Sequence, residues 1–399
     1  MSRLRIGAAM ALLLAACGGG GNEPGPSDAL RPVGVSETLR FTELQTSQAH
    51  ACGVDADGST WCWGSNRDGE LGTATTPDLC DIPGIELVAC TGTPQRLAGA
   101  PRFTRLSLTG GYGHSCALAA DGQAWCWGFG LGGQLGDGLH TSRSTPAPVA
   151  GTQRFVGLRS SDSAEATCGL TAAGAVWCWG FDYRGVVGSG LLDQAMPEPL
   201  RIDWGLPIVD FDLGQMHGCG IAADGRAWCW GNNWYGTLGV GSAGGNGGLA
   251  GSSVPVPVLG GHVFRRIGAG LNHSCALDDA GAAWCWGAGS VASSPSGAGY
   301  VGEPSPVPGG HVFVDLRSGA LHSCGLTADG VAWCWGENYA GELGNGTRTP
   351  GTAPVRVDAP VAFSRLAERP TCALSADGRA WCWGDNSYGQ VGRRSGYAR

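Results

Sequence analysis

The sequence predicts an all-β repeat protein, and three observations lead to that prediction. A unit of the form C-G-V-D-A-D-G-S-T-W-C-W-G, first seen at residues 52–64, recurs seven times with its two cysteines always ten residues apart. The distance between successive copies varies from 48 to 64 residues, as expected when fixed units are joined by loops of variable length. The 72 Gly and 22 Pro supply turns, and no segment has helical periodicity.

Each copy is expected to form a β-hairpin. In the first copy Gly58 stands where a three-residue loop requires a positive φ, which glycine adopts without strain. Counting outward from that loop places Cys52 opposite Cys62 and Trp61 opposite Gly53. A large indole above a residue without a side chain is a favourable cross-strand pair.

The cysteine pairing follows from this register, because directly opposed strand residues lie close enough for a disulfide. Buried reduced thiols are the alternative, and without a C-x-x-C motif a zinc site is not expected. Two further cysteines lie in a long insertion of the first repeat and are expected to bond each other. The predicted pairs are Cys52–Cys62, Cys80–Cys90, Cys116–Cys126, Cys168–Cys178, Cys219–Cys229, Cys275–Cys285, Cys324–Cys334 and Cys372–Cys382.

The N-terminus is typical of an exported protein. Arg3 and Arg5 precede an apolar run at residues 6–16 that is too short to span a membrane as a helix. The run ends in Leu-Ala-Ala-Cys17, which resembles the bacterial lipobox, in which the cysteine is lipidated; an ordinary secretory peptide is the alternative. We therefore expect a signal peptide at 1–17 with lipidation at Cys17, and a Gly/Pro tether at 18–29. Gly18 after the cysteine favours the outer membrane, on either its periplasmic or its surface side.

Further elements recur around each hairpin. A short strand with an aromatic or apolar first residue precedes it, as in Phe41-Thr-Glu-Leu44. A G-x-N-x-x-G-x-L-G turn follows it, as at 64–72, and then a Pro/Val segment, as at 146–149. Proline cannot donate a ladder hydrogen bond, so these last segments are expected at sheet edges. The repeat therefore contains four short strands.

With its H-S-C-A-L, D-G, W-C-W-G and G-x-N-x-x-G-Q-L-G motifs, the chain resembles the regulator-of-chromosome-condensation repeat family. The resemblance implies a seven-bladed β-propeller of four-stranded antiparallel blades over residues 30–399. The seventh repeat ends without a Pro/Val strand, whereas an additional one, Arg31-Pro-Val-Gly-Val35, precedes the first repeat. This N-terminal strand is expected to complete the last blade and close the ring.

No catalytic motif, cofactor motif or metal-binding pair is evident, so no enzyme is expected. The net charge of −8 argues against nucleic-acid binding. Five histidines share one repeat position and are expected to form a ring: His50, His114, His217, His273 and His322. Such a ring can bind a metal or sense pH, but side-chain hydrogen bonds that fix the preceding loop are the interpretation we favour.

Function is expected on one loop face of the propeller, because loops on a rigid scaffold commonly carry binding residues. Aromatic and arginine side chains dominate protein contacts, although each Tyr can equally pack on its own turn. The candidate contact residues are Trp234, Tyr235, Tyr183, Tyr339, Tyr388, Arg67 and Arg184.

We therefore predict a monomeric, lipid-anchored propeller of the bacterial envelope that binds an envelope or extracellular protein. Binding of a glycan or another small ligand is the alternative. An enzyme inhibitor is a further possibility, since a secreted bacterial β-lactamase inhibitor is similar in using this propeller type. The membrane is contacted only through the lipid, and the partner's identity cannot be read from the sequence.

Overall fold

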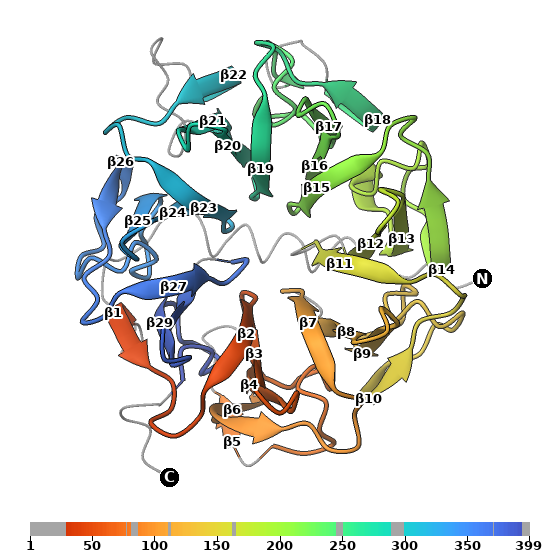
Figure 1. Cartoon of the computed structure of the whole chain (residues 1–399). Coiled ribbons are helices and arrows are strands. Elements are labelled where there is room, and N and C mark those ends of the chain that lie inside the picture. The colour runs from red at the N-terminus through yellow and green to blue at the C-terminus, as the bar shows by residue number, and fades with distance from the viewer. Residues whose placement is uncertain are drawn as a thin grey trace.

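The seven repeats fold into seven antiparallel sheets arranged around a central axis (Figure 1). The structure is a computed structural model and describes residues 29–76, 78–80, 87–110, 113–161, 165–244, 250–288, 299–369 and 371–392. The predicted seven-bladed β-propeller is confirmed. Cys17 and the tether before Ala29 lie outside the described residues. None of the described segments forms a helix able to cross a membrane.

The first strand of each blade lies nearest the axis, with its aromatic or apolar first residue buried (Figure 1). These are the segments that the sequence predicts upstream of each hairpin. The inner strands are β2 (Phe41–Thr46), β7 (Phe103–Leu108), β11 (Phe155–Ser160), β15 (Ile208–Leu213), β19 (Phe264–Ala269), β23 (Phe313–Ser318) and β27 (Phe363–Leu366).

The second and third strands of each blade are the two arms of the repeated hairpin. Their glycine-containing turn has the predicted conformation, with Gly58 at φ 77° and its amide donating to the Asp55 carbonyl at 3.0 Å. The arms are β3 (His50–Asp55) and β4 (Thr60–Ser65), β8 (His114–Ala119) and β9 (Ala124–Gly128), β12 (Ala166–Thr171) and β13 (Val176–Phe181), β16 (His217–Ala222) and β17 (Ala227–Asn232), β20 (His273–Asp278) and β21 (Ala283–Ala288), β24 (His322–Thr327) and β25 (Ala332–Gly336), and β28 (Cys372–Ser375) and β29 (Ala380–Gly384).

The Pro/Val segments form the outer strands, as their missing amide donors predict. One short 3-10 helix, η1 (Tyr183–Gly185), lies in the turn before β14. The outer strands are β6 (Val88–Arg96), β10 (Arg143–Pro148), β14 (Ala195–Ile202), β18 (Gly251–Pro257), β22 (Tyr300–Pro306), β26 (Gly351–Arg356) and, in the last blade, β1 (Ala29–Gly34).

The strand that closes the ring comes from the N-terminal end of the described chain. β1 pairs with β29, with Val33 opposite Cys382, so the last sheet has the order β1-β29-β28-β27. Residues from opposite ends of the propeller domain thus share one blade, and the predicted closure is confirmed.

The first blade departs from the predicted four strands. Its insertion adds a fifth strand, β5 (Asp78–Cys80), which pairs with β6 at the sheet edge. A disulfide joins Cys80 to Cys90 on the neighbouring strand, with the two Cα atoms 5.8 Å apart. The insertion is therefore fixed covalently to the blade that carries it.

The hairpin register is as predicted, and all seven hairpin disulfides are present. Cys52 pairs with Cys62 and Trp61 with Gly53. The Cα atoms of the seven hairpin pairs lie 4.0 to 4.2 Å apart, as in closely spaced cross-strand pairs. Eight buried disulfides are typical of a chain that folds in an oxidising compartment.

Gly53 lies opposite Trp61, but its lack of a side chain makes room for a residue other than this indole. A Cβ atom at Gly53 would lie 2.5 Å from the ring of Phe41, the first residue of the inner strand. The indole of Trp61 is half-buried and donates from Nε1 to the Asp55 carboxylate at 2.9 Å. The aromatic residue that requires the glycine is therefore on the inner strand.

The second tryptophan of each hairpin is fully buried and contacts the preceding blade. Trp127 donates from Nε1 to the Glu70 carbonyl at 2.9 Å, and Trp230 donates to the Val186 carbonyl at 2.7 Å. Each acceptor belongs to the turn that follows the hairpin of the previous blade. These indoles therefore contribute both to the hydrophobic core and to the attachment of one blade to the next.

Removing one hairpin disulfide is expected to weaken the protein without unfolding it. Replacing Cys116 and Cys126 together with Ala should lower the free energy of unfolding by about 2 kcal/mol, because the bond closes a loop of only about eleven residues. Urea titration at neutral pH measures this change. Non-reducing peptide mapping of the unchanged protein should recover the eight pairs, and a linkage between different blades would contradict the hairpin register.

Candidate interaction face and axial network

The two ends of the propeller axis differ in the segments that they carry. We call the end where the inner strands finish the loop face; it carries the G-x-N-x-x-G turns, such as 64–72. We call the opposite end the hairpin face; it carries the D-G hairpin turns, such as 55–59, and the connections between blades, such as 97–102. β1 begins at the loop face, because Ala29 pairs with Gly384 at the end of β29.

The turns of the loop face are held by their own asparagine. The buried Asn233 accepts from the Leu238 amide at 3.0 Å and donates to the Ser242 carbonyl at 2.9 Å. Asn66, Asn338 and Asn386 also accept from the amide five residues on, at 2.9 to 3.1 Å. Residues at the tips of these turns are therefore presented on a fixed backbone.

Three of the predicted aromatic contact residues are exposed on these turns. Trp234 and Tyr235 lie side by side in the chain at the tip of the fourth blade's turn, and Tyr339 occupies the corresponding turn of the sixth blade. The Trp234 amide donates to the Asn232 side chain at 2.9 Å, which helps to fix the tip. These three aromatic side chains are therefore exposed enough to contact a partner.

The other predicted contact residues form two separate groups. Tyr183 is half-buried against the core of the third blade, with the exposed Arg184 guanidinium 5.3 Å from its ring centre. Tyr388 is half-buried on the Cys80–Cys90 disulfide, and burial raises the pKa of its phenol. The exposed Arg67 lies close enough to that phenol to oppose this rise. The seven candidates therefore do not form one group: two tyrosines are partly packed, as the alternative interpretation expects.

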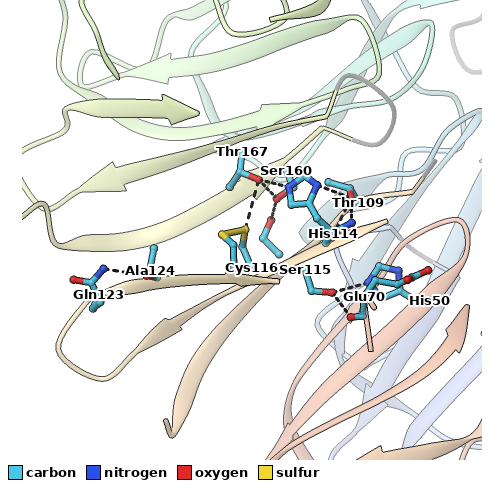
Figure 2. Close-up of a disulfide and its surroundings, with 12 residues drawn as sticks. His50, Glu70, Thr109, His114, Ser115, Cys116, Gln123, Ala124, Ser160 and Thr167 are labelled. Atoms are coloured by element: carbon cyan, nitrogen blue, oxygen red, sulfur yellow. Dashed lines mark hydrogen bonds between the residues drawn. A yellow bond between two sulfur atoms is a disulfide. The ribbon is translucent and has the colours of Figure 1, made fainter. Parts of the chain in front are cut away.

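The histidine ring is buried and connects neighbouring blades. His50 donates from Nε2 to the Ser115 hydroxyl of the next blade at 2.9 Å, and that hydroxyl donates to the Glu70 carbonyl (Figure 2). His114 makes the same contact with Thr167 at 2.8 Å. Burial lowers the pKa to about 3 for His50, His114, His217 and His273.

These contacts support the hydrogen-bonding interpretation of the ring and add a connection that the sequence does not reveal. Ser47 and Thr109 place a hydroxyl 3.0 and 3.1 Å from Nδ1 of His50 and His114, fixing the loop that precedes the strand. No group of three metal-ligating side chains occurs among the described residues. The four imidazoles whose pKa burial lowers to about 3 are neutral at physiological pH.

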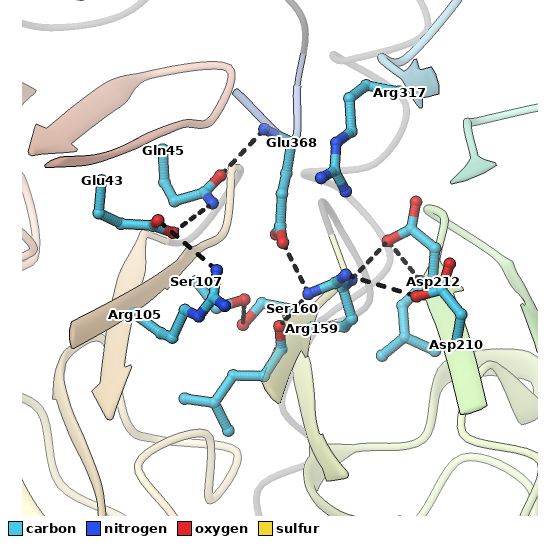
Figure 3. A network of polar contacts seen from close by, with 12 residues as sticks. Glu43, Gln45, Arg105, Ser107, Arg159, Ser160, Asp210, Asp212, Arg317 and Glu368 are labelled. Carbon is cyan, nitrogen blue, oxygen red and sulfur yellow. Dashed lines mark hydrogen bonds and ion pairs between the residues drawn. The ribbon is translucent and has the colours of Figure 1, made fainter. Parts of the chain in front are cut away.

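A network of charged residues surrounds the axis, and the sequence analysis does not predict it. It is formed mainly by the third and fifth residues of the inner strands. Glu43 accepts from Arg365 of the last blade and lies 3.8 Å from Arg105 of the second. The Arg159 guanidinium lies 3.7 Å from the Asp210 carboxylate and 3.9 Å from the Asp212 carboxylate, both on the fourth blade (Figure 3). The network therefore links blades through their innermost strands.

Two residues of the last blade extend this network across the axis. Glu368 accepts from Arg159 of the third blade at 2.7 Å. The Arg369 guanidinium is buried and donates to four carbonyls, those of Ser160, Leu213, Ala269 and Ser318, at distances between 2.8 and 3.4 Å. These four residues are the last ones of β11, β15, β19 and β23, so one side chain joins four blades at the loop face.

A sequence signal for this network exists. The inner strands carry charged residues at alternate positions, as in Ile208-Val-Asp-Phe-Asp212. Alternate residues of a strand lie on the same face, so these charges lie together on one face. Arg369 stands next to Pro370, which occupies the histidine position of the seventh repeat and lies outside the described residues. Two repeats lack this histidine, the third with Ala166 and the seventh, and the seventh carries the arginine that reaches the other blades.

The sequence profile of the Regulator of chromosome condensation (RCC1) repeat matches residues 57–118, 121–170 and 224–277. A second profile with the same description matches 264–291, 313–342 and 371–390. Together the matches cover more than half of the chain. The chain belongs to the RCC1 repeat family.

Known members of this family are distant relatives. The chain is 25% identical to the ultraviolet-B receptor UVR8 of Arabidopsis thaliana over 65% of this chain and 56% of that protein. It is 28% identical to the human E3 ubiquitin-protein ligase HERC2 over 63% of this chain, which is 5% of HERC2. The chain thus spans about half or less of the length of these relatives.

Solved structures share the fold. Human WBSCR16 superposes with a TM-score of 0.71 at 19% identity, over 85% of this chain and 86% of that one. Yeast RCC1 (Prp20), solved bound to Kap60, superposes with a TM-score of 0.66 at 19% identity, over 86% and 81% of the two chains. At this identity the likeness shows the propeller fold alone.

Proposed function

We propose that this protein is a lipid-anchored propeller of the bacterial envelope that binds a partner protein through its loop face. The observation that carries the proposal is the exposure of Trp234, Tyr235 and Tyr339 on asparagine-fixed turns of that face. Rigid, exposed aromatic residues lose little conformational entropy on binding and are common hot spots of protein interfaces.

The comparisons support a protein-binding role in general terms. Yeast Prp20 is described as binding Kap60, Gsp1p and histones, and its fold is that of this chain. HERC2 is a ligase, but the match covers only 5% of that protein, so we carry no ligase activity over. We assign the chain a binding function and no catalytic step.

The experiment that tests the proposal is photo-crosslinking in the native envelope. A photoreactive amino acid at position 234 or 339 should give an adduct of discrete mass with a protein. The same amino acid at Val312, which is exposed on a connection at the hairpin face, is the matched control and should not give that adduct. Glycan capture at 234 without any protein adduct would instead favour the glycan-binding alternative.

Combined replacement of Trp234 and Tyr235 with Ala is expected to weaken partner binding at least tenfold, or about 1.4 kcal/mol. The melting temperature should stay near that of the unchanged protein, because both side chains are exposed. Calorimetry and a binding titration against the crosslinked partner measure the two effects. A large drop in melting temperature with full binding per folded molecule would mean that these aromatics only pack on their turn.

Cys17→Ser is expected to move the protein from the membrane fraction to the soluble fraction, because the proposed anchor is the lipid on that residue. Fractionation and labelling with a radioactive fatty acid measure this change. Wild-type protein that carries no label, with unchanged fractionation of the variant, would contradict the lipid anchor. That outcome would leave the proposed contact face untouched.

A further inference from the structure

The arginines of the axial network become less exposed from the hairpin face toward the loop face. Those at the third position of an inner strand, nearest the hairpin face, have side chains exposed by 52% (Arg105), 36% (Arg266) and 28% (Arg365). Those at the fifth position are exposed by 17% (Arg159) and 11% (Arg317). The axis is therefore open to solvent on the hairpin face, whereas Arg369 and the carbonyls that it binds close it on the loop face.

The acidic partners are less exposed than the arginines that solvent reaches. The side chains of Glu43, Asp210, Asp212, Asp315 and Glu368 are exposed by only 4 to 18%. Three of these acidic residues stand at the third strand position, level with the outer arginines, so an incoming molecule meets guanidinium groups that are more exposed than the carboxylates beside them.

Two of the three outer arginines, Arg105 and Arg266, are only loosely paired, whereas Arg365 donates to Glu43. Within the described ranges, the one ionic partner of Arg105 is Glu43 at 3.8 Å, which is too long for a hydrogen bond. Arg266 lies 3.8 Å from Asp210 and 3.5 Å from Asp315. By contrast, the deeper Arg159 makes a 2.7 Å contact with Glu368. The guanidiniums of Arg105 and Arg266 thus retain donors for an incoming anion.

We propose that Arg105, Arg266 and Arg365, which we call the axial site, bind the carboxylates of a ligand that enters from the hairpin face. Six arginines of the network face five acidic residues, so the axis carries a local positive balance although the whole chain has a net charge of −8. The partly desolvated setting of the deeper members of the network strengthens such a field. The planar fork of arginine matches a carboxylate, and several arginines around one axis favour a polycarboxylate.

The shared ligand chemistry can come from two sources, a free small polycarboxylate or an acidic peptide segment. Figure 3 shows Arg105 and Arg159 on neighbouring inner strands of this network, with Arg317 from farther round the axis. The test therefore uses two probes on the full-length protein, citrate and a hexaglutamate peptide, each by calorimetric titration at low ionic strength. Tighter binding of hexaglutamate than of citrate identifies the peptide source, and the reverse identifies the small acid; either supports the site.

The deciding variant is Arg105→Gln combined with Arg266→Gln, which is expected to weaken binding of the better probe at least about tenfold. The matched control is Arg67→Gln combined with Arg184→Gln, which removes the same charge from the loop face and should leave the affinity unchanged. The probe should also raise the melting temperature of the wild type and of the control, but not that of the axial variant.

Two results would overturn the proposal. One is the absence of binding of either probe by the wild type at millimolar concentration. The other is equal weakening by the axial and the control variants, which would indicate a general charge effect. If the axial variant melts below the assay temperature, the double variant Arg105→Lys with Arg266→Lys replaces it. Lysine keeps the positive charge but lacks the planar fork of arginine. Unchanged affinity of this variant for both probes would also overturn the carboxylate site. The loop-face aromatics are untouched in every variant, so failure here does not bear on the proposed partner binding.

Discussion

Arg369→Met is expected to lower the free energy of unfolding by about 3 to 5 kcal/mol, the cost of removing one member of a buried charged network. Its guanidinium donates to carbonyls of four different blades, and Met fills similar space without any donor. The carbonyls of Ser160, Leu213, Ala269 and Ser318 would each lose a charged donor in a buried setting, where unsatisfied polar groups are costly.

Urea titration at pH 7 measures this loss, and a second substitution serves as its control. Arg226→Met makes the same chemical change at an exposed arginine of a hairpin turn, whose one ionic partner among the residues that the structure describes is the exposed Asp224. Its effect should stay within about 0.5 kcal/mol. Equal stability of the Arg369 and Arg226 variants would show that Arg369 does not join the blades energetically.

Acidification from pH 7 to pH 5 is expected to destabilise the propeller by several kcal/mol through its buried histidines. In the folded protein burial holds the pKa of His50, His114, His217 and His273 at about 3, against 6.5 for an ordinary histidine. The unfolded chain therefore binds more protons between these values, and stability falls as the pH drops below 6.5. At pH 5 each imidazole contributes a loss of about 2 kcal/mol.

Buried carboxyls oppose part of this loss. Burial raises the pKa of Glu165 to about 6 and also raises the pKa of Glu70, so the folded state takes up protons on these groups as the pH falls. Burial also raises the pKa of Asp68, Asp182 and Asp212, which adds to this opposing effect. The net effect remains a loss of stability, because burial lowers each imidazole pKa from 6.5 to about 3, whereas it raises the pKa of Glu165 only from 4.5 to about 6. A plot of unfolding free energy against pH should therefore rise from pH 4 to pH 6.5 and flatten above.

Single variants assign this pH dependence to the ring. His114→Gln should be less stable at pH 7. Its unfolding free energy should also rise less steeply between pH 4 and pH 6.5, because unfolding of the variant takes up fewer protons, by up to about one. His262→Gln is the control, because His262 is outside the ring and stacks against Trp284 with ring centres 4.2 Å apart. A slope unchanged by His114→Gln, or reduced equally by both variants, would rule out the ring as the source.

Much of the fold could be predicted because its main features are local in sequence. The ten-residue spacing of Cys52 and Cys62 around Gly58 determines the hairpin register within thirteen residues of chain. The prolines of segments such as 146–149 place them at sheet edges because they lack a donor, and the additional N-terminal strand at 31–35 indicated which blade would be completed from the other end. Register, backbone donors and, outside the first blade with its additional β5, strand count are all visible in a linear sequence.

The candidate contact face could be predicted only in part. Trp234, Tyr235 and Tyr339 are exposed as expected, whereas Tyr388 packs on the Cys80–Cys90 disulfide. The insertion that carries this disulfide belongs to the first repeat and Tyr388 to the seventh, so only closure of the ring brings them together. Exposure of a turn residue depends on such neighbours and not on its own repeat.

The sequence by itself determined the hairpins, their disulfides, the strand order of every blade except the first, and the way in which the ring closes. Only the tertiary structure decided how the blades are joined: His50 to Ser115, Glu368 to Arg159, and Arg369 to carbonyls at the ends of four inner strands. The physical reason is distance along the chain. Arg369 lies 209 residues from Ser160, and a contact over that separation exists only once seven similar blades have placed the ends of their inner strands around a common axis.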